Sequence, residues 1–222
     1  LITETIGPGW IAKAGELAQL TAYQDDTALL EKLAQVKYQN KVKLAGLIKE
    51  RTGITVDPNS VFDIQVKRIH AYKRQLLNVF RILDLYNRLK ENPRLPVHPH
   101  TFIFGGKAAP GYHYAKTVIK LINTLADKIN NDPDMQDKIK VIFLENFNVS
   151  LAERIYPAAE ISQQVSTASR EASGTGNMKF MLNGAITLGT LDGANVEIRQ
   201  AVGDDHIFIF GLNTDKVMNF YQ

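Results

Sequence analysis

The residues with the clearest chemical potential are at positions 169–180, Ser-Arg-Glu-Ala-Ser-Gly-Thr-Gly-Asn-Met-Lys-Phe. Small residues from Ala172 to Gly176 leave main-chain N–H groups unhindered, just before a short helix that we predict over residues 177–182. Such a loop, followed by a helix N-terminus, favours phosphate binding. Lys179 lies about one helical turn beyond Gly176, so its amine can return to the same pocket. A phosphate cradle beside a primary amine suits a phosphorylated aldehyde cofactor, with the amine forming a Schiff base.

An ordinary glycine-rich loop followed by a solvated lysine is the alternative interpretation. The stretch matches no nucleotide fingerprint, because Gly-Thr-Gly at residues 174–176 is followed by Lys179 where a dinucleotide site needs a third glycine. The sequence Gly-Gly-Lys-Ala at residues 105–108 lacks the first glycine and the Ser or Thr of a P-loop.

A second cluster lies at residues 66–75, Val-Lys-Arg-Ile-His-Ala-Tyr-Lys-Arg-Gln, where a predicted strand runs into a helix. Its cations are Lys67, Arg68, Lys73 and Arg74. Arginine offers a bidentate fork and lysine a point charge, so the cluster suits a phosphate substrate. The alternative interpretation is that the cluster forms a solvated basic face beside a helix. If both clusters share one edge of a sheet, they can bind more than a single phosphate.

Other catalytic chemistry has little support. No metal site is predicted, because the histidines lack metal-ligand spacing and cysteine is absent. There is no Gly-x-Ser-x-Gly nucleophile elbow. Glu145, Glu160 and Glu171 lie near predicted strand ends, but the sequence does not decide whether two carboxylates face one another across a sugar. Some aromatic side chains can stack on a ligand or pack in the core: Tyr112, Phe147 and Tyr156.

The composition is that of a globular protein, with 45% hydrophobic and 22% charged residues. A net charge of +3 is too small to predict nucleic-acid binding, and no apolar run approaches the roughly 20 residues of a membrane helix. Without cysteine, a reducing, cytoplasmic location is expected. The chain begins at Leu1 without an initiator Met and stops as a helix begins near residues 213–215, so we interpret both ends as cuts through a longer polypeptide.

Apolar strands alternate with amphipathic helices along most of the chain. This pattern predicts a Rossmann-like α/β domain, a mostly parallel sheet with helices on both faces. Residues 1–57 form a helical lead-in segment and residues 58–222 the cofactor- and phosphate-binding domain, truncated at both ends. The strands are predicted at residues 61–66, 101–104, 141–144, 161–165, 185–188 and 207–210, and the main helices at residues 71–91, 112–131 and 150–156.

Ligands in such sheets lie beyond the carboxyl ends of the strands. The segments that fall there are Lys67-Arg68, Gly105-Gly106, Glu145-Asn146 and the residues after Val165. Both anion-seeking clusters are therefore expected at one edge of one sheet.

Residues 171–184, Glu-Ala-Ser-Gly-Thr-Gly-Asn-Met-Lys-Phe-Met-Leu-Asn-Gly, resemble the pyridoxal-phosphate signature of the α-glucan phosphorylases, which act on glycogen, starch or maltodextrin. Residues 66–78, 105–112 and 190–197 also resemble that family, in the same order. The resemblance runs over essentially the whole chain and is strongest from about residue 58 to 211. Several long motifs in sequence are far more specific than one glycine-rich loop.

The resemblance implies the C-terminal half of a two-domain GT-B glycosyltransferase, with the active site between the halves. Such an enzyme cleaves the terminal α-1,4 link of a glucan with inorganic phosphate and releases glucose 1-phosphate with retention. It also implies a homodimer in the intact enzyme. The 222-residue chain alone is expected to be inactive, because the N-terminal domain supplies the other wall of the sugar site.

The resemblance also assigns roles to residues. Lys179 forms the imine with pyridoxal phosphate, and the cofactor's phosphate acts as the proton relay to the substrate phosphate. The cofactor phosphate is held by Lys67 and the backbone at Gly174, Thr175 and Gly176. Arg68 and Lys73 bind the substrate phosphate, and the sugar hydroxyls are bound by Glu171, Ala172, Ser173 and Gly174.

The chain departs from the family pattern at a few positions. Phe147-Asn148 stands where many members have Tyr-Arg, so contacts to cofactor or phosphate there are in doubt. Ala71 replaces an acidic residue that is common in animal members. Two other functions stay open: a pyridoxal-phosphate enzyme of amino-acid chemistry, for which we identify neither an Asp for the pyridinium nor an Arg for the carboxylate, and a non-catalytic sugar- or nucleotide-binding module.

Overall fold

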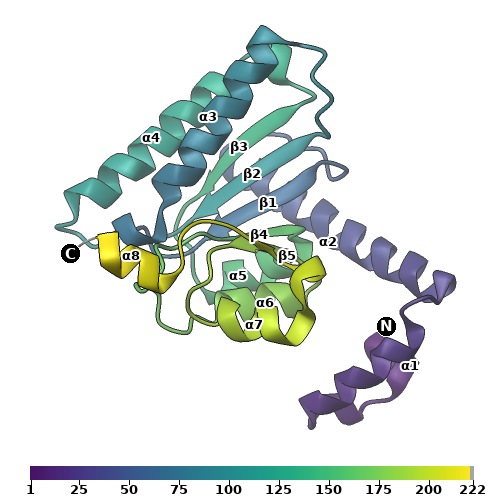
Figure 1. Cartoon of the computed structure of the whole chain (residues 1–222). Helices are drawn as coiled ribbons and strands as arrows, with labels where there is room; N and C mark the ends of the chain where they lie inside the picture. The colour runs from purple at the N-terminus through teal and green to yellow at the C-terminus, as the bar shows by residue number, and fades with distance from the viewer. Residues whose placement is uncertain (221–222) are drawn as a thin grey trace.

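The computed structural model describes residues 1–220 as a twisted sheet between two layers of helices, with an N-terminal helical arm that stands away from them (Figure 1). All six strands are parallel, in the order β3-β2-β1-β4-β5-β6. The predicted α/β fold with a parallel sheet is therefore confirmed. The strands are β1 Val61–Val66, β2 His100–Gly105, β3 Ile139–Leu144, β4 Ile161–Gln164, β5 Ile186–Gly189 and β6 Phe208–Ile209.

Helices cover both faces of the sheet. On one face α3 and α4 lie over β1, β2 and β3, and on the other face α2 and α5 pack against the same strands (Figure 1). The α-helices are α1 Ile2–Ile6, α2 Thr27–Thr52, α3 Gln75–Glu91, α4 His113–Asn130, α5 Val149–Ile155, α6 Gly176–Leu182, α7 Asn195–Val202 and α8 Thr214–Phe220. The short 3-10 helices are η1 Gly9–Ile11, η2 Ala14–Tyr23, η3 Ala71–Lys73, η4 Pro133–Met135, η5 Tyr156–Ala158 and η6 Asp204–His206.

Strand β2 is buried on both of its faces. Along β2, Phe102 and Phe104 join the core under α3 and α4, while Ile103 joins the core on the opposite face. Successive residues of a strand point to opposite faces, so a strand between two helical layers needs no polar face.

Strand β1 differs, because its face toward α3 is polar. The fully buried carboxylate of Asp63 accepts hydrogen bonds from Arg81 Nη2 at 2.7 Å and from Gln163 Nε2 at 2.7 Å. Gln65 Oε1 accepts a hydrogen bond from Asn78 Nδ2 at 3.0 Å. These bonds join β1 to α3 and to β4 with every partner satisfied, as buried polar groups require.

The strand order reverses between β1 and β4, since β2 and β3 extend the sheet on one side of β1 and β4 to β6 on the other. Such a reversal opens a crevice beyond the carboxyl ends of the two central strands, where doubly wound folds bind their ligands. Lys67 directly follows β1, and Gln164 is the last residue of β4. The topology therefore brings the basic segment and the chain after β4 to one place.

Some local predictions were wrong in detail. The helix expected over residues 71–91 is the 3-10 turn η3, then Arg74 in a left-handed conformation with φ 56°, then α3. The guanidinium of Arg74 donates to the carbonyls of Val165 at 2.6 Å and Ser166 at 3.3 Å, which fixes this break. Helix α7 was not predicted at all. Within the helical lead-in segment, the elements before α2 are the short helix α1 and the 3-10 helices η1 and η2.

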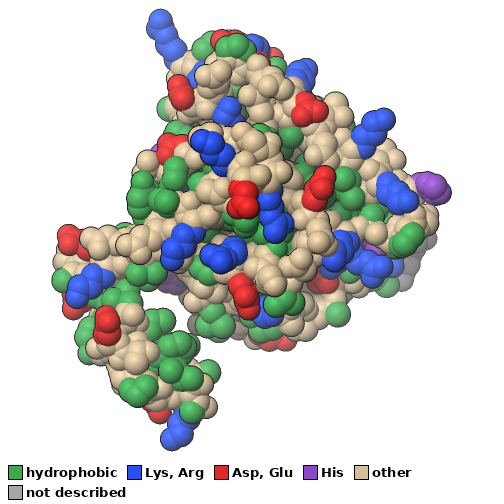
Figure 2. Space-filling view, turned by 180° about the vertical axis from the view of Figure 1, so that it is seen from behind, with side chains coloured by type: hydrophobic (Ala, Val, Ile, Leu, Met, Phe, Trp, Pro, Cys, Tyr) green, Lys and Arg blue, Asp and Glu red, His purple; other side chains and the backbone are tan. Residues whose placement is uncertain are grey.

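The lead-in helix α2 belongs in part to the packed body, since Leu44 and Ile48 are fully buried in the core that contains β1. Its first half leaves the body, and Figure 2 shows the N-terminal arm projecting with hydrophobic side chains along it. Leu30, Leu33 and Val36 are 47%, 51% and 41% exposed. The domain division at residue 57 remains a prediction. No helix within the described residues has the length and apolar character needed to cross a membrane.

Candidate active site

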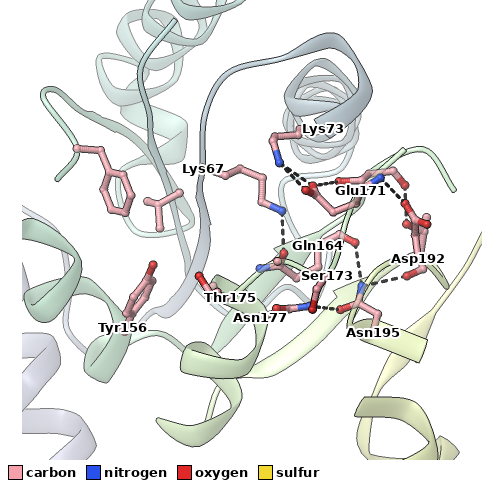
Figure 3. Close-up of a pocket in the computed structure, with 16 residues that line it drawn as sticks. Lys67, Lys73, Tyr156, Gln164, Glu171, Ser173, Thr175, Asn177, Asp192 and Asn195 are labelled. Carbon is pink, nitrogen blue, oxygen red and sulfur yellow. Dashed lines mark hydrogen bonds and ion pairs between the residues drawn. The ribbon is translucent and has the colours of Figure 1, made fainter. Parts of the chain in front are cut away.

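A cavity of about 210 Å³ lies beyond the carboxyl ends of β1 and β4, at the point where the strand order reverses (Figure 3). It is smaller than the roughly 300–1,000 Å³ typical of ligand pockets, so it has room for one small ligand rather than a sugar chain. Its walls come from both predicted clusters and from the chain after β5. The lining residues are Val66, Lys67, Lys73, Phe147, Tyr156, Gln164, Ser166, Glu171, Ser173, Gly174, Thr175, Gly176, Asn177, Thr190, Asp192 and Asn195.

Lys67 supplies a poorly neutralised amine in this cavity. Its Nζ donates to Gln164 Oε1 at 2.7 Å, across the ends of β1 and β4. Burial, and then the positive charge of Lys73, lower the pKa of Lys67 to about 8, although Glu171 acts in the opposite direction. A buried ammonium group with a single neutral partner is stabilised by any anion that enters the cavity.

Gly106 holds the backbone of Lys67 in place. A Cβ at Gly106 would collide with the carbonyl oxygen of Lys67, and it would lie 3.0 Å from Cδ1 of Ile69. The N–H of Lys67 also donates to the carbonyl of Gly105 at 3.0 Å. The close approach of these two segments explains why the residue after β2 is a glycine.

Lys73 is already paired. Its Nζ lies 2.8 and 2.6 Å from the two carboxylate oxygens of Glu171, and Ser166 Oγ donates to the same carboxylate at 2.9 Å. Burial lowers the pKa of Lys73, but the bonds to Glu171 and the contact with Tyr72 outweigh burial and raise it above its ordinary value. For Glu171, burial raises the pKa, but the bonds from Lys73 and Ser166 prevail and lower it. Both groups are therefore ionised at neutral pH.

The glycine-rich loop, residues 171–176, presents unused main-chain donors to the cavity. Within residues 1–220, the N–H groups of Gly174, Thr175 and Gly176 donate to no protein acceptor. Gly174 has φ 78°, a conformation in which a side chain would be strained. Free amides beside the ammonium group of Lys67 form an anion cradle, so the residues present fit the phosphate group of pyridoxal phosphate.

The structure brings most of the predicted site residues together, but not all of them. The side chains of Arg68 and Lys179 are exposed and do not line the cavity, and exposed Ala172 is also outside it. Lys179 is on α6, one turn after Gly176, and its amine has no ion pair or hydrogen bond among the described residues. The four-carbon stem of a lysine is flexible, so the predicted imine at Lys179 would require this side chain to turn toward the cavity.

Several polar lining residues were not predicted individually: Gln164, Ser166, Thr190, Asp192 and Asn195. They belong to the end of β4 and to the chain that follows β4 and β5. Their position could have been predicted, because polar residues directly after parallel strands lie at the ligand-binding edge of the sheet. They were missed because β4 and β5 contain few apolar residues, so the ends of these strands are hard to recognise in the sequence.

The aromatic wall clarifies one departure from the family pattern. Phe147 and Tyr156 both line the cavity, and Tyr156 packs edge-on against Phe180 with 4.5 Å between ring centroids. Asn148 instead caps α5, where its Oδ1 accepts from the N–H of Leu151 at 3.0 Å. The side chain at position 148 therefore has a structural role here.

The other candidate carboxylates lie away from the cavity. Glu160 is at the amino end of β4 and binds Lys41 at 2.7 Å, and exposed Glu145 does not line the cavity. Among the described residues no group of three or more His, Cys, Asp or Glu side chains can hold a metal ion. The cavity thus presents amines, amides and two carboxylates, Glu171 and Asp192, that already have hydrogen-bond partners.

Comparison with known proteins identifies the family of the chain. The family model for carbohydrate phosphorylase matches residues 1–222. The chain is 54% identical over 222 residues to glycogen phosphorylase of Bacillus subtilis, which covers 100% of this chain and 28% of that protein. It is 55% identical over 217 residues to glycogen phosphorylase of Synechocystis sp., and 52% identical over 217 residues to the muscle form of Oryctolagus cuniculus; each match covers 98% of this chain and 26% of the relative. The chain thus spans about a quarter of the length of these curated relatives, and it belongs to the carbohydrate phosphorylase family.

Proposed function

We propose that this chain is the cofactor- and phosphate-binding part of a pyridoxal-phosphate-dependent α-1,4-glucan phosphorylase, and that the whole enzyme converts glucan and inorganic phosphate to a shortened glucan and glucose 1-phosphate with retention. The observation that supports this best is the cavity at the strand-order reversal, where Lys67 and free loop amides from a distant segment form one anion cradle. The glycogen phosphorylases named above support the reaction and the substrate class.

The cofactor phosphate is the anion that we assign to this cradle. Lys67 would bind it together with the N–H groups of Gly174, Thr175 and Gly176, and Lys179 would hold the cofactor from the next turn of α6. When bound, pyridoxal phosphate supplies a phosphate group that can exchange a proton with the substrate phosphate. The lowered pKa of Lys67 suits this role, because the ammonium form gains its missing counter-charge from the anion.

The substrate phosphate would bind next to the cofactor phosphate, through Lys73 and Arg68. Lys73 is paired with Glu171 in the structure, so this role requires the lysine to share its charge between the carboxylate and the incoming anion. Two neighbouring phosphates need surrounding cations and a shared proton. Lys67, Arg68 and Lys73 are cations of the segment that follows β1 at this edge of the sheet.

Sugar hydroxyls are the proposed ligands of Glu171, Ala172, Ser173 and Gly174. The cavity is too small for a glucan as well as a cofactor, so the rest of a longer polypeptide would form the opposite wall, as in a two-domain GT-B enzyme. The exposed apolar side chains of the N-terminal arm support further polypeptide packing there. A homodimeric intact enzyme and a cytoplasmic location remain part of the proposal.

Reductive labelling tests the proposal. The chain is incubated with pyridoxal phosphate or with pyridoxal, reduced with borohydride and mapped by peptide analysis. We expect labelling of Lys179 in preference to other exposed lysines such as Lys120, and only when the reagent carries its phosphate. Lys67→Met should abolish that preference, while Lys120→Met should not. Equal labelling of Lys179 and Lys120 by both reagents would refute the cofactor site.

The activity is tested separately. The 222-residue chain should release no glucose 1-phosphate from glycogen and phosphate, even when loaded with pyridoxal phosphate. Release by this chain alone would contradict the requirement for a second wall.

A further inference from the structure

The segment after β5, Asp192-Gly193-Ala194-Asn195, contacts the glycine-rich loop along its length. We call residues 192–195 the anchor segment. It has no role in the proposed function, and its side chains are buried: Asp192 is 9% exposed, Ala194 6% and Asn195 3%. A polar sequence that is buried beside a binding loop needs partners, and here the loop supplies them.

Asp192 binds the start of the loop. One carboxylate oxygen accepts a hydrogen bond from the N–H of Ser169 at 2.9 Å. The other accepts from the N–H of Glu171 at 2.8 Å (Figure 3). Ser169 has φ 76°, a left-handed conformation that is unfavourable for serine. Charge-assisted bonds to the backbone are strong, so Asp192 holds this bend and thereby the direction of Glu171.

The next two residues bind the middle of the loop. The N–H of Ala194 donates to the carbonyl of Ser173 at 2.8 Å. Gly193 approaches the loop so closely that a Cβ there would collide with the carbonyl oxygen of Ala172 and lie 2.9 Å from that of Ser173. These carbonyls therefore face the anchor segment.

Asn195 joins the end of the loop to the wall that carries Lys67. Its Oδ1 accepts from Asn177 Nδ2 at 3.0 Å, and its Nδ2 donates to the carbonyls of Thr190 at 3.0 Å and Gln164 at 3.3 Å. Gln164 in turn accepts from Lys67. The buried side chain of Asn195 thus fixes the position of the free loop amides relative to the ammonium group of Lys67.

From these contacts we infer that the anchor segment positions the glycine-rich loop for phosphate binding, with Asp192 as the principal positioning residue. None of its side chains needs to touch the reacting atoms. Asp192 determines where Glu171 stands, and Asn195 determines the spacing between Lys67 and the free amides. This inference rests on the proposed function for the identity of the ligand, but the positioning itself is a property of the loop.

Two variants at one site, with a matched control, test it. Asp192→Asn keeps one acceptor oxygen and Asp192→Ala keeps none. The control, Asp204→Asn, changes an exposed aspartate that pairs with Arg199 and does not line the cavity. The ratio of Lys179 labelling by pyridoxal phosphate to that by pyridoxal should fall by about tenfold in the alanine variant and by about threefold in the asparagine variant, and stay unchanged in the control. The thermal midpoint of the asparagine variant should stay close to that of the parent chain.

Hydrogen exchange at Ser169 and Glu171 separates this inference from the proposed function. Exchange of these amides should accelerate in both Asp192 variants without any ligand. If the parent chain shows no phosphate-dependent labelling but the amides lose protection, the cofactor proposal fails and the loop positioning stands. Unchanged exchange and labelling in Asp192→Asn would overturn the inference. Should Asp192→Ala not fold, Gly193→Ala gives a second test by displacing the same loop.

Discussion

Buried or half-buried lysines lie at both ends of the central sheet, but their hydrogen-bond partners differ. At the amino end, Lys37 donates to the carbonyls of Ala159 at 2.7 Å and Asn183 at 2.6 Å. Lys41 donates to the carbonyl of Ser60 at 2.8 Å and to Glu160 at 2.7 Å. Burial lowers the pKa of Lys37 to about 8, as it does for Lys67 at the carboxyl end. Lys67, however, has one amide oxygen as its partner and a cavity beside it.

Backbone strain also differs between the amino and carboxyl ends of the sheet. Within residues 1–220, the non-glycine residues with positive φ are Arg74, Asn146 and Ser169, and each lies in a loop that follows the carboxyl end of a strand. Left-handed non-glycine residues cost free energy and persist where the surroundings over-determine them, which is common at functional sites. The amino end is therefore built for stability, and the carboxyl end keeps unsatisfied donors and strained loops for a ligand.

The largest expected effect is at the amino end, where Lys41→Met removes a satisfied amine. The carbonyl of Ser60 and the carboxylate of Glu160 would lose their partner, because Lys41 is only 4% exposed and water cannot fully replace it. The free energy of unfolding should fall by about 2–3 kcal/mol. Urea denaturation measures it, with exposed Lys43→Met as the control. A loss below that of the control would show that the amino-end amines are not structural.

Gly106→Ala tests the contact that places Lys67. The added methyl group would meet the carbonyl of Lys67, which belongs to the backbone and cannot rotate away. We expect a loss of about 1–3 kcal/mol in unfolding free energy, together with loss of phosphate-dependent labelling at Lys179. Gly111→Ala is the matched control, since a Cβ there meets nothing within 4 Å. Equal stability and labelling in both variants would mean that Lys67 is not held by this glycine.

Lys67→Met should change the free energy of unfolding in the opposite direction, so that the variant is more stable than the parent chain at neutral pH. The pKa of Lys67 is lowered to about 8, so the unfolded chain binds more protons than the folded chain between pH 8 and the ordinary lysine pKa of about 10.4. Stability of the parent chain therefore rises with pH in that window, and below it the buried charge is a full cost. Replacing Lys67 should raise the unfolding free energy at pH 7 by about 1–2 kcal/mol and flatten the rise at higher pH.

Lys37→Met is the comparison for that experiment. Burial lowers the pKa of Lys37 to about 8, as for Lys67. The substitution, however, also leaves the carbonyls of Ala159 and Asn183 without their donor, so we expect no gain in stability at pH 7. Denaturation at pH 7 and pH 9.5 distinguishes the two variants. A loss of stability in Lys67→Met equal to that in Lys37→Met would place Lys67 among the structural lysines.

The sequence predicted the fold better than the placement of individual side chains. The mostly apolar segments of β1 to β3 and the helices between them predicted a parallel sheet, because each strand is buried on both faces. The two anion-seeking clusters were correctly expected at one edge, since the carboxyl ends of parallel strands meet there. Helix α7 was missed, because Asp-Gly-Ala-Asn at residues 192–195 is typical of a turn rather than a helix start.

The direction of a side chain depends on contacts that no local pattern contains. Glu171 and Lys73 are 98 positions apart in sequence, and their ion pair follows from the packing of β1 beside β4. Lys179 is exposed, although its spacing from Gly176 predicted that its amine would face the cavity. The flexible lysine side chain has many rotamers, and among the described residues its amine has no acceptor that would fix it inside the cavity. The roles of Lys179 and Arg68 therefore stay predictions, as do the roles of the other site residues.

Ser169→Gly has the smallest expected effect and separates strain from positioning at the carboxyl end. Glycine adopts φ 76° without a steric penalty, and the N–H that donates to Asp192 remains, so the unfolding free energy should rise by about 0.5–1 kcal/mol. Ser173→Gly, at a residue without positive φ, should instead lower it slightly. Differential scanning calorimetry of both variants measures the contrast. If Ser169→Gly is less stable than Ser173→Gly, the left-handed bend is not strained, and the carboxyl end then differs from the amino end in its unsatisfied donors alone.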